Sequence, residues 1–402
     1  MRSQRLWFVG AAVLSCVASA GCWPVSGSLA GEPRSVAAPR SIAATSTPAP
    51  SPSATPHRVP APKRTPPDHS AERKHRARST HSPGTRAGGG GRHGCGVSAI
   101  LVPSCGALWG VAPGAFTDAP KPKALANFER KVGRRVDIVH LYHRGDDLFP
   151  THEEIAMARH GRLLYLNWKP EFGTGRTWAE VAHGAVDGEI DRLASYIDGH
   201  YHKRFFLTIH HEPEDDVRPS AGSGYTAKDY AAMFRHVAKR LRADGVDNAV
   251  TVMNYMGAEK WGEKPWFGAL YPGDRVVDWI AYDPYAGDGT TSFAQLVNKY
   301  FGSRDDWPGF YTWATRTHPD KPLMLGEWGV FAQRDDPSHK ASIFRSAMRQ
   351  ARHFPRIKAY VYFGSPQAPR GDTTVDSTSR ALRAFRALSD LRYFRLPVLA
   401  HR

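Results

Sequence analysis

From about residue 95 onward, short apolar runs alternate along the chain with amphipathic stretches. Runs of this length bounded by turn residues predict strands, and we expect them at Leu108–Val111, Val136–Tyr142, Leu163–Trp168, Phe205–His210, Ala249–Asn254, Val277–Tyr282, Pro322–Leu325 and Ala359–Phe363. The stretches between them have the spacing of helices with one apolar face, as in residues 230–243. Eight strands alternating with helices predict an α/β fold of the (β/α)8 TIM-barrel type, which needs about 250 residues. An open doubly wound sheet is the alternative, but no Gly-rich phosphate loop follows the first strand.

The amino-acid composition before residue 95 is different. Residues 23–94 are rich in Pro, Ser, Thr, Ala and Gly and end in four consecutive glycines, Gly88–Gly91. Large apolar side chains are too scarce there to offset the entropy lost on ordering. We therefore expect a disordered linker over residues 23–94 and one folded domain, large enough for a (β/α)8 barrel, over residues 95–402.

The first 22 residues have the pattern of an export signal. Arg2 and Arg5 precede an apolar run, Leu6–Ala20, which is shorter than the roughly 20 residues that a membrane-spanning helix needs. Small residues suited to a signal peptidase follow, and the segment ending at Cys22 also resembles a lipobox. Either ordinary cleavage near Ala20 or lipidation of Cys22 places the protein outside the cytoplasm, secreted or anchored at the cell surface.

The formal net charge of +16 lies mostly outside the predicted domain. Residues 23–94 hold 11 Lys/Arg and 3 Asp/Glu, and Arg2 and Arg5 add to this excess. A basic, solvated tail adheres to an acidic wall or membrane surface more readily than it distinguishes bases. Because no nucleic-acid-binding motif accompanies the charge, we expect no nucleic-acid partner.

Of the four cysteines, two lie in the domain. Cys16 and Cys22 belong to the signal segment, which leaves Cys95 and Cys105. In an oxidising compartment, two cysteines this close in sequence predict a disulfide bond.

Candidate chemistry gathers where the predicted strands end. In a (β/α)8 barrel the active site forms at the carboxyl ends of the strands. The fourth strand is followed by Glu212 and the seventh by Glu327, and aromatic residues flank both. Retaining glycoside hydrolysis needs two such carboxyl groups about 5–5.5 Å apart, one as nucleophile and one as acid/base.

A metal site is the other chemistry that this region suggests. His210, His211, Glu212 and Glu214 are all ligand types. Adjacent strand residues point to opposite faces, so these side chains converge poorly, and we expect neither a metal nor a cofactor.

These motifs resemble glycoside hydrolase family 26, over roughly residues 105–395. The resemblance rests on His211-Glu212 after the fourth strand, Tyr285 after the sixth, and Glu327 followed by Trp328 after the seventh. It implies Glu212 as acid/base, Glu327 as nucleophile, and Tyr285 as the hydrogen-bond partner of the nucleophile.

Further sugar contacts are implied at the strand ends. His143, Trp168, His211, Tyr285 and Trp328 are the substrate-binding residues that we expect from the resemblance and from the aromatic residues at these ends. The chain departs from the family's mannanases at residues 213–216, which follow the acid/base, and at residues 362–364, where a tryptophan is usual.

The sequence therefore predicts an extracellular retaining endo-β-glycanase whose partner is its polysaccharide substrate. β-Mannan is the expected polymer, and a related enzyme acting on β-glucan or β-xylan stays open because both departures lie near the sugar-binding subsites. A barrel that binds polysaccharide of the cell surface without cleaving it is the alternative from another class. An intact pair of glutamates argues against that alternative.

Overall fold

The computed structural model describes residues 95–298 and 307–396. The predicted signal segment with Cys22 and the predicted linker, residues 23–94, lie outside the described residues, as do residues 299–306 and 397–402.

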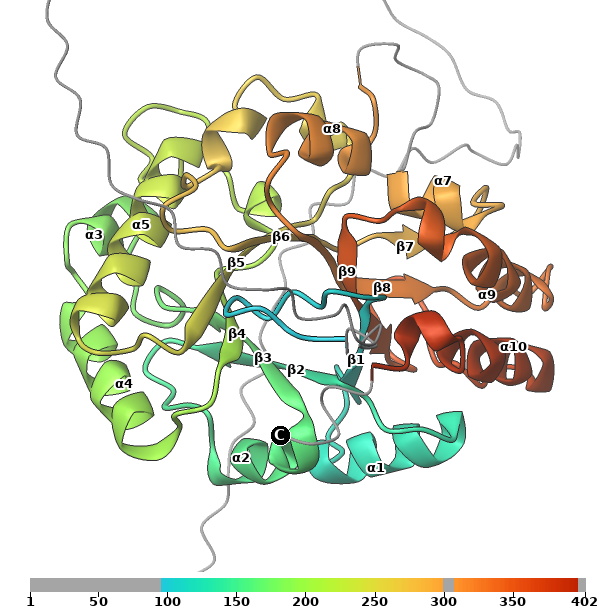
Figure 1. Cartoon of the computed structure of the whole chain (residues 1–402). Helices are drawn as coiled ribbons and strands as arrows, with labels where there is room; N and C mark the ends of the chain where they lie inside the picture. Colours follow the sequence, from blue (N-terminus) through green and yellow to red (C-terminus); the bar gives the residue numbers. More distant parts are fainter. Residues whose placement is uncertain (1–94, 299–306, 397–402) are drawn as a thin grey trace, which may run out of the picture. The chain divides into compact units, whose positions relative to one another are not determined.

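Eight parallel strands close into a barrel, so the predicted (β/α)8 fold is confirmed (Figure 1). Each barrel strand pairs with the next one along the chain, and the last pairs with the first, which closes the circle. The barrel strands are β1 (Leu108–Pro113), β2 (Ile138–Arg144), β3 (Leu163–Lys169), β4 (Phe205–Ile209), β5 (Ala249–Tyr255), β6 (Trp279–Tyr282), β8 (Leu323–Val330) and β9 (Ile357–Gly364). All eight overlap the predicted runs. A two-residue strand that the sequence did not predict, β7 (Tyr285–Ala286), pairs with the end of β8.

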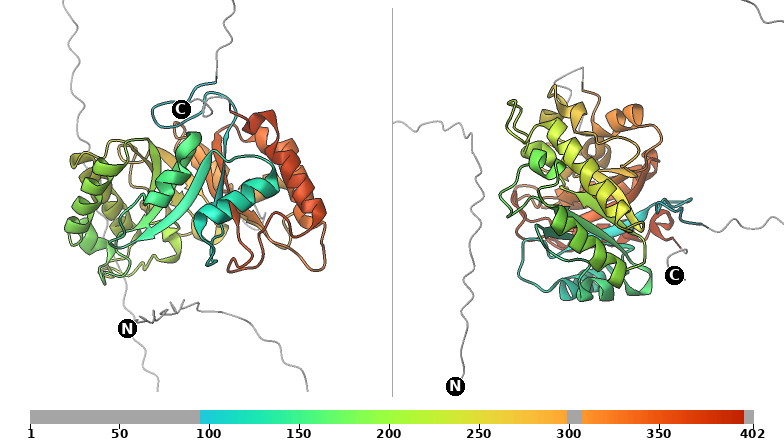
Figure 2. Two further views of the ribbon diagram at one scale, coloured as in Figure 1. Left: turned by 90° about the horizontal axis from the view of Figure 1, so that it is seen from below. Right: turned by 90° about the vertical axis from the view of Figure 1, so that its left-hand side faces the viewer.

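Helices follow the strands and surround them, as the two further views in Figure 2 also show. The described α-helices are α1 (Lys121–Val132), α2 (His152–Met157), α3 (Trp178–Ala182), α4 (Asp187–His200), α5 (Ala227–Ala243), α6 (Glu259–Gly262), α7 (Phe293–Asn298), α8 (Phe310–Thr317), α9 (His339–Gln350) and α10 (Ser379–Ser389). Short 3-10 turns are η1 (Arg159–Gly161), η2 (Pro213–Asp215), η3 (Phe267–Leu270), η4 (Ala351–His353) and η5 (Arg392–Phe394). No helix of the described residues is long and apolar enough to span a bilayer.

Local sequence sets where several of these helices begin. Thr151, Thr177 and Thr226 each cap a helix through a capping box, in which the threonine and an acidic residue three positions later satisfy each other's backbone N–H groups. These boxes fix the starts of α2, α3 and α5, the helices that follow the second, third and fourth strands.

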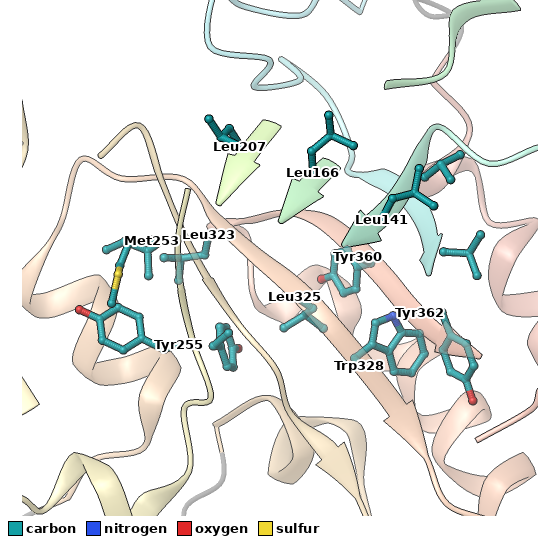
Figure 3. Close-up of a cluster of buried hydrophobic side chains, with 14 of the residues drawn as sticks. Leu141, Leu166, Leu207, Met253, Tyr255, Leu323, Leu325, Trp328, Tyr360 and Tyr362 are labelled. Atoms are coloured by element: carbon teal, nitrogen blue, oxygen red, sulfur yellow. The ribbon is translucent and has the colours of Figure 1, made fainter. Parts of the chain in front are cut away.

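Alternation along the strands divides the core into two layers. Outward-facing side chains pack under the helices, and Figure 3 shows ten of them labelled, including Leu141, Leu207 and Tyr360. Inward-facing side chains such as Ile138 and Phe206 fill the barrel itself.

The N-terminal segment of the domain closes one end of the barrel. Leu101 and its neighbours pack against the inward-facing layer, and the indole of Trp279 donates to the backbone oxygen of Ile100 at 2.6 Å. The structure pairs Cys95 with Cys105 in this segment, with Cα atoms 5.5 Å apart. The open end is therefore the one at which the strands finish.

Strand β8 contains a β-bulge that the sequence analysis did not anticipate. Leu325 pairs with Tyr360 and Trp328 pairs with Tyr362, so β8 uses one residue more than β9 between these two pairs. Such an extra residue shifts the alternation of the strand. The predicted strand, Pro322–Leu325, was thus too short, because the pairing with β9 resumes beyond the bulge.

Candidate active site

Glu327 lies at the bulge of β8 and is 7 % exposed. Its two carboxylate oxygens each accept a hydrogen bond from a tyrosine. Tyr142 at the end of β2 donates to Oε1, and Tyr285 in β7 donates to Oε2, both at 2.6 Å. The contact of Tyr285 that the resemblance implied is present, and Tyr142 supplies a second donor of the same kind.

A chain of hydrogen bonds beneath Glu327 fixes its backbone. The N–H of Glu327 donates to Asp283 Oδ1 at 2.7 Å, and Asn254 donates to Asp283 Oδ2 at 2.5 Å. Asn254 in turn accepts from the hydroxyl of Tyr165 at 2.7 Å, which also lies 2.8 Å from Thr208. The network joins β3, β4, β5, the residue directly after β6, and β8, so five strands or their ends share in positioning one carboxylate.

Gly326 leaves the space that this network needs. A Cβ at this position would lie 2.0 Å from Oδ1 of Asn254 and 2.9 Å from Oδ1 of Asp283. Only a glycine lets both side chains approach the strand this closely.

Glu212 follows β4 in the left-handed backbone conformation, with φ at 51°. His210, two residues earlier, has φ at 52°. Bulky residues with positive φ are strained, and such strain persists where the surrounding structure enforces it. The backbone N–H of Glu212 donates to the carbonyl oxygen of Asn254 at 3.0 Å, which holds this turn against β5.

His210 anchors the turn from within the fold. Its ring is buried and both nitrogens face carboxylates: Nδ1 contacts Glu171, and Nε2 lies 2.9 Å from Asp216. Lys169 also pairs with Asp216, at 3.3 Å. Although burial opposes it, the hydrogen bonds from His210 and Lys169 hold the pKa of Asp216 well below its usual range. His210 therefore ties the loop of Glu212 to the loop after β3.

The two glutamates differ in how strongly they hold a proton. Burial raises the pKa of Glu212 well above its usual value, and the charge of Glu327 raises it further. Burial also raises the pKa of Glu327, but the hydroxyls of Tyr142 and Tyr285 oppose that rise. The two carboxyl groups are thus within electrostatic reach of each other, and the tyrosine hydroxyls stabilise the ionised form of Glu327.

His211 lies beside this pair. Its ring centroid is 5.7 Å from that of Tyr142, and burial lowers its pKa well below the usual value, so the ring is neutral at neutral pH. Its Nδ1 is buried without a hydrogen-bond partner in the described part of the chain. A neutral imidazole with a spare nitrogen can bind a hydroxyl group.

The structure places three of the predicted sugar contacts in surroundings other than the glutamate pair. The ring of His143 stacks on Phe149 at 4.4 Å, and its Nε2 lies 3.0 Å from Glu154, on the side of α2. Trp168 has no exposed surface and donates to the backbone oxygen of Gly145 at 2.9 Å. His143 and Trp168 are each adjacent in their strand to an inward-facing residue, so strand alternation turns their side chains toward the helices.

Trp328 is the third. Its ring is fully buried in the outer layer, 4.9 Å from Tyr362 and 6.2 Å from Trp109 (Figure 3). The bulge turns Glu327 toward the barrel axis and, one residue later, Trp328 away from it. A side chain without accessible surface cannot contact a sugar.

Sequence reasoning missed Tyr142, Asp283 and Asn254. Tyr142 and His140 lie on the same face of β2, the face opposite to that of His143. The alternation of the apolar residues earlier in β2 predicts that the side chains of this face point into the barrel. This pattern could have identified Tyr142 from the sequence. For Asp283, its position directly after β6 gave the same kind of signal.

The alternative metal ligands diverge. Glu214 is fully buried and accepts backbone hydrogen bonds from Met256 and Gly257, while His210 contacts carboxylates. Burial raises the pKa of Glu214 to about 7. Within residues 95–298 and 307–396, no group of three or more His, Cys, Asp and Glu side chains is arranged to hold a metal ion.

Comparison with known proteins adds relatives of two kinds. No family model matches the chain. Endoglucanase H of Acetivibrio thermocellus is 28 % identical over 281 residues, which is 66 % of this chain and 29 % of that protein. The chain thus spans less than a third of the length of this curated relative.

Two solved structures have a similar fold. A ruminal family 26 endo-β-1,4-mannanase superposes with a TM-score of 0.51 at 14 % identity, covering 73 % of this chain and 66 % of that one. The catalytic domain of the family 26 endo-β-1,4-mannanase of Bacillus sp. JAMB-750 gives 0.50 at 15 % identity, covering 72 % and 86 %. At these identities the structural likeness establishes the (β/α)8 fold that these family 26 enzymes share with the chain.

Proposed function

We propose that the chain is a retaining β-glycanase of glycoside hydrolase family 26, with Glu327 as nucleophile and Glu212 as acid/base. The observation that carries the proposal is the unequal environment of the two carboxyl groups. Two tyrosine hydroxyls favour the ionised form of Glu327, whereas Glu212 has a raised pKa and accepts no such hydrogen bond from the described residues. Different proton affinities in one site are what double displacement needs.

The reaction then has two steps. In the first, the carboxylate of Glu327 attacks the anomeric carbon while Glu212 gives its proton to the glycosidic oxygen, and the shortened chain leaves as an alcohol. In the second, the carboxylate of Glu212 takes a proton from water, the water oxygen attacks the anomeric carbon, and the bond to Glu327 breaks. The neutral ring of His211 is placed to hold a sugar hydroxyl through its free Nδ1.

The substrate is a β-linked polysaccharide. Fold likeness to endo-β-1,4-mannanases supports β-mannan, and sequence likeness to an endoglucanase supports β-glucan. Hydrolysis of pure mannans, glucans and xylans, with product sizes recorded, decides between them. We further propose that the protein acts outside the cell, held at the wall or membrane surface through its basic N-terminal segment.

A fluorinated glycoside of the matching sugar tests the nucleophile. Its slow deglycosylation traps the covalent intermediate, and mass spectrometry of the digested protein should place the label on Glu327. A label on another residue refutes the assignment.

Substitution tests the pair. Glu327→Ala should lower turnover by at least about 10⁴-fold with the fold retained, since the whole nucleophile is removed. Glu154→Gln is the matched control, because it alters a buried carboxyl group of α2 that contacts His143 instead of the pair. Polysaccharide binding without product release by the unmodified protein would favour a non-catalytic binding barrel instead.

A further inference from the structure

A cleft of about 730 Å³ opens at the rim where β2 and β3 end, and neither Glu212 nor Glu327 lines it. Its walls come from the loop after β2, the loop after β3 and the start of α4. The residues that matter for its chemistry are Arg144, Asp146, Asp147, Phe172, Arg176 and Glu189.

One wall carries an aromatic ring with a cation over it. Phe172 is 46 % exposed, and the guanidinium carbon of Arg144 lies 5.0 Å from its ring centroid. In the described part of the chain no ion pair involves Arg144. Its N–H donors are therefore available to a ligand, already held in place by the ring beneath them.

The floor of the cleft is rigid. The N–H of Gly145 donates to the backbone oxygen of Lys169 at 2.9 Å, and Gly145 accepts from the indole of Trp168 at 2.9 Å. A Cβ at Gly145 would lie 2.6 Å from the backbone oxygen of Phe172, so the two loops touch here. A cleft with such a floor exists before a ligand arrives.

The exposed apolar residues point to the same sector of the barrel rim. All four exposed large hydrophobic residues of the described chain lie at the ends of β1, β2 and β3: Phe116, Tyr142, Leu148 and Phe172. Tyr142 links this sector to the glutamate pair, because its hydroxyl donates to Glu327 and Arg144 follows two residues later on the same strand.

We propose that this cleft is a remote subsite that binds a neutral sugar unit of the polysaccharide, outside the bond being cleaved. The inference rests on the proposed function. Arginine donors and carboxylate acceptors together match hydroxyl groups, which both donate and accept, and the exposed ring of Phe172 packs against the C–H groups of a sugar. Three carboxylates against two guanidiniums disfavour a uronic acid, whose negative charge would meet Asp146, Asp147 and Glu189.

Substitution of Arg144→Ala and, separately, Phe172→Ala tests the subsite. Arg352→Ala is the matched control, since Arg352 is also exposed over an aromatic ring, that of Tyr393 at 5.8 Å, but precedes β9 at the opposite end of the barrel. Each protein is assayed on the polysaccharide that the unmodified protein hydrolyses best and on a short aryl β-glycoside of the same sugar.

Both cleft variants should raise KM for the polysaccharide about tenfold, which corresponds to about 1.4 kcal/mol of lost binding. Their kcat/KM for the aryl glycoside should stay within about twofold of that of the unmodified protein. Behaviour equal to that of Arg352→Ala overturns the inference, and so does an equal loss on both substrates, which would place these residues at the cleaved bond.

If the unmodified protein cleaves nothing, the proposed function fails while the subsite can still be tested. Electrophoresis through gels containing each neutral polysaccharide then measures binding directly. Retardation that is lost in Phe172→Ala but kept in Arg352→Ala supports the subsite, and equal mobility of all three proteins in every gel overturns it.

Discussion

Removing the hydroxyl of Tyr142 should move the pH at which the protein loses activity in acid. Tyr142→Phe deletes one of the two O–H groups that donate to Glu327 at 2.6 Å. A hydrogen bond to a charged group contributes about 1.5–3 kcal/mol. Since one pKa unit corresponds to about 1.36 kcal/mol, the pKa of Glu327 should rise by roughly 1–2.

The sign follows from which form reacts. Glu327 attacks as the carboxylate, and loss of a donor destabilises that form, so protonation begins at higher pH. The acidic limb of kcat/KM against pH should therefore move to a pH higher by about 1–2, and activity below the limb should fall about tenfold for each pH unit that the limb moves. The pair titrates as a coupled system, so the limb reports its lower apparent pKa.

The assay is the pH profile of kcat/KM on a soluble substrate, for Tyr142→Phe, Tyr285→Phe and a control. Tyr360→Phe is that control, because Tyr360 is buried and its hydroxyl donates to the backbone oxygen of Ala351 at 3.1 Å, outside the site. The limb should move equally in the first two variants and stay in place in the third. An acidic limb that does not move in Tyr142→Phe would refute the role of this residue.

Three further substitutions test the framework of the site. Gly326→Ala should abolish turnover and lower the free energy of unfolding by about 1–3 kcal/mol, because the new Cβ would overlap Asn254. The control Gly268→Ala should do neither, since no atom lies within 4 Å of a Cβ there, and equal activities of the two variants would contradict this. His210→Ala should lower the unfolding free energy by about 3 kcal/mol in denaturant titrations by leaving a buried carboxylate partner unpaired, and a loss below about 1 kcal/mol would count against the anchor. Glu214 has a pKa of about 7 in the folded protein against 4.5 when exposed, so its contribution to the free energy of unfolding is full below pH 4.5 and is lost as pH rises through 7. Glu214→Gln should therefore reduce the fall in unfolding free energy between pH 4.5 and 7.5 by about 3 kcal/mol, and an unchanged pH dependence would refute this.

Much of the fold could be predicted because short-range patterns of apolar and polar residues identify its strands and helices. The apolar runs of the eight strands stand out against polar helices, and the capping boxes at Thr151, Thr177 and Thr226 mark helix starts. The end of β8 could not be found in this way, since the bulge breaks the alternation that identifies a strand.

The site divides in a similar way. Glu212, Glu327, His211 and Tyr285 follow the ends of the strands that the sequence predicts, and strand order alone brings such residues to one rim. The direction of a side chain is different, because it depends on the phase of alternation, which a single shifted residue reverses. His143 lies on the helix side of β2 for that reason, and Tyr142 takes the position beside the nucleophile candidate.

The sequence by itself determined the barrel, the order of its strands and the rim on which two glutamates meet, because periodicity and connection rules are local properties of the chain. Tertiary structure alone decided which oxygen each tyrosine contacts, that burial raises the pKa of both carboxyl groups, and that Trp328 packs in the core. These depend on burial and on contacts between residues far apart in sequence, such as Tyr142 and Glu327, and no local pattern encodes them.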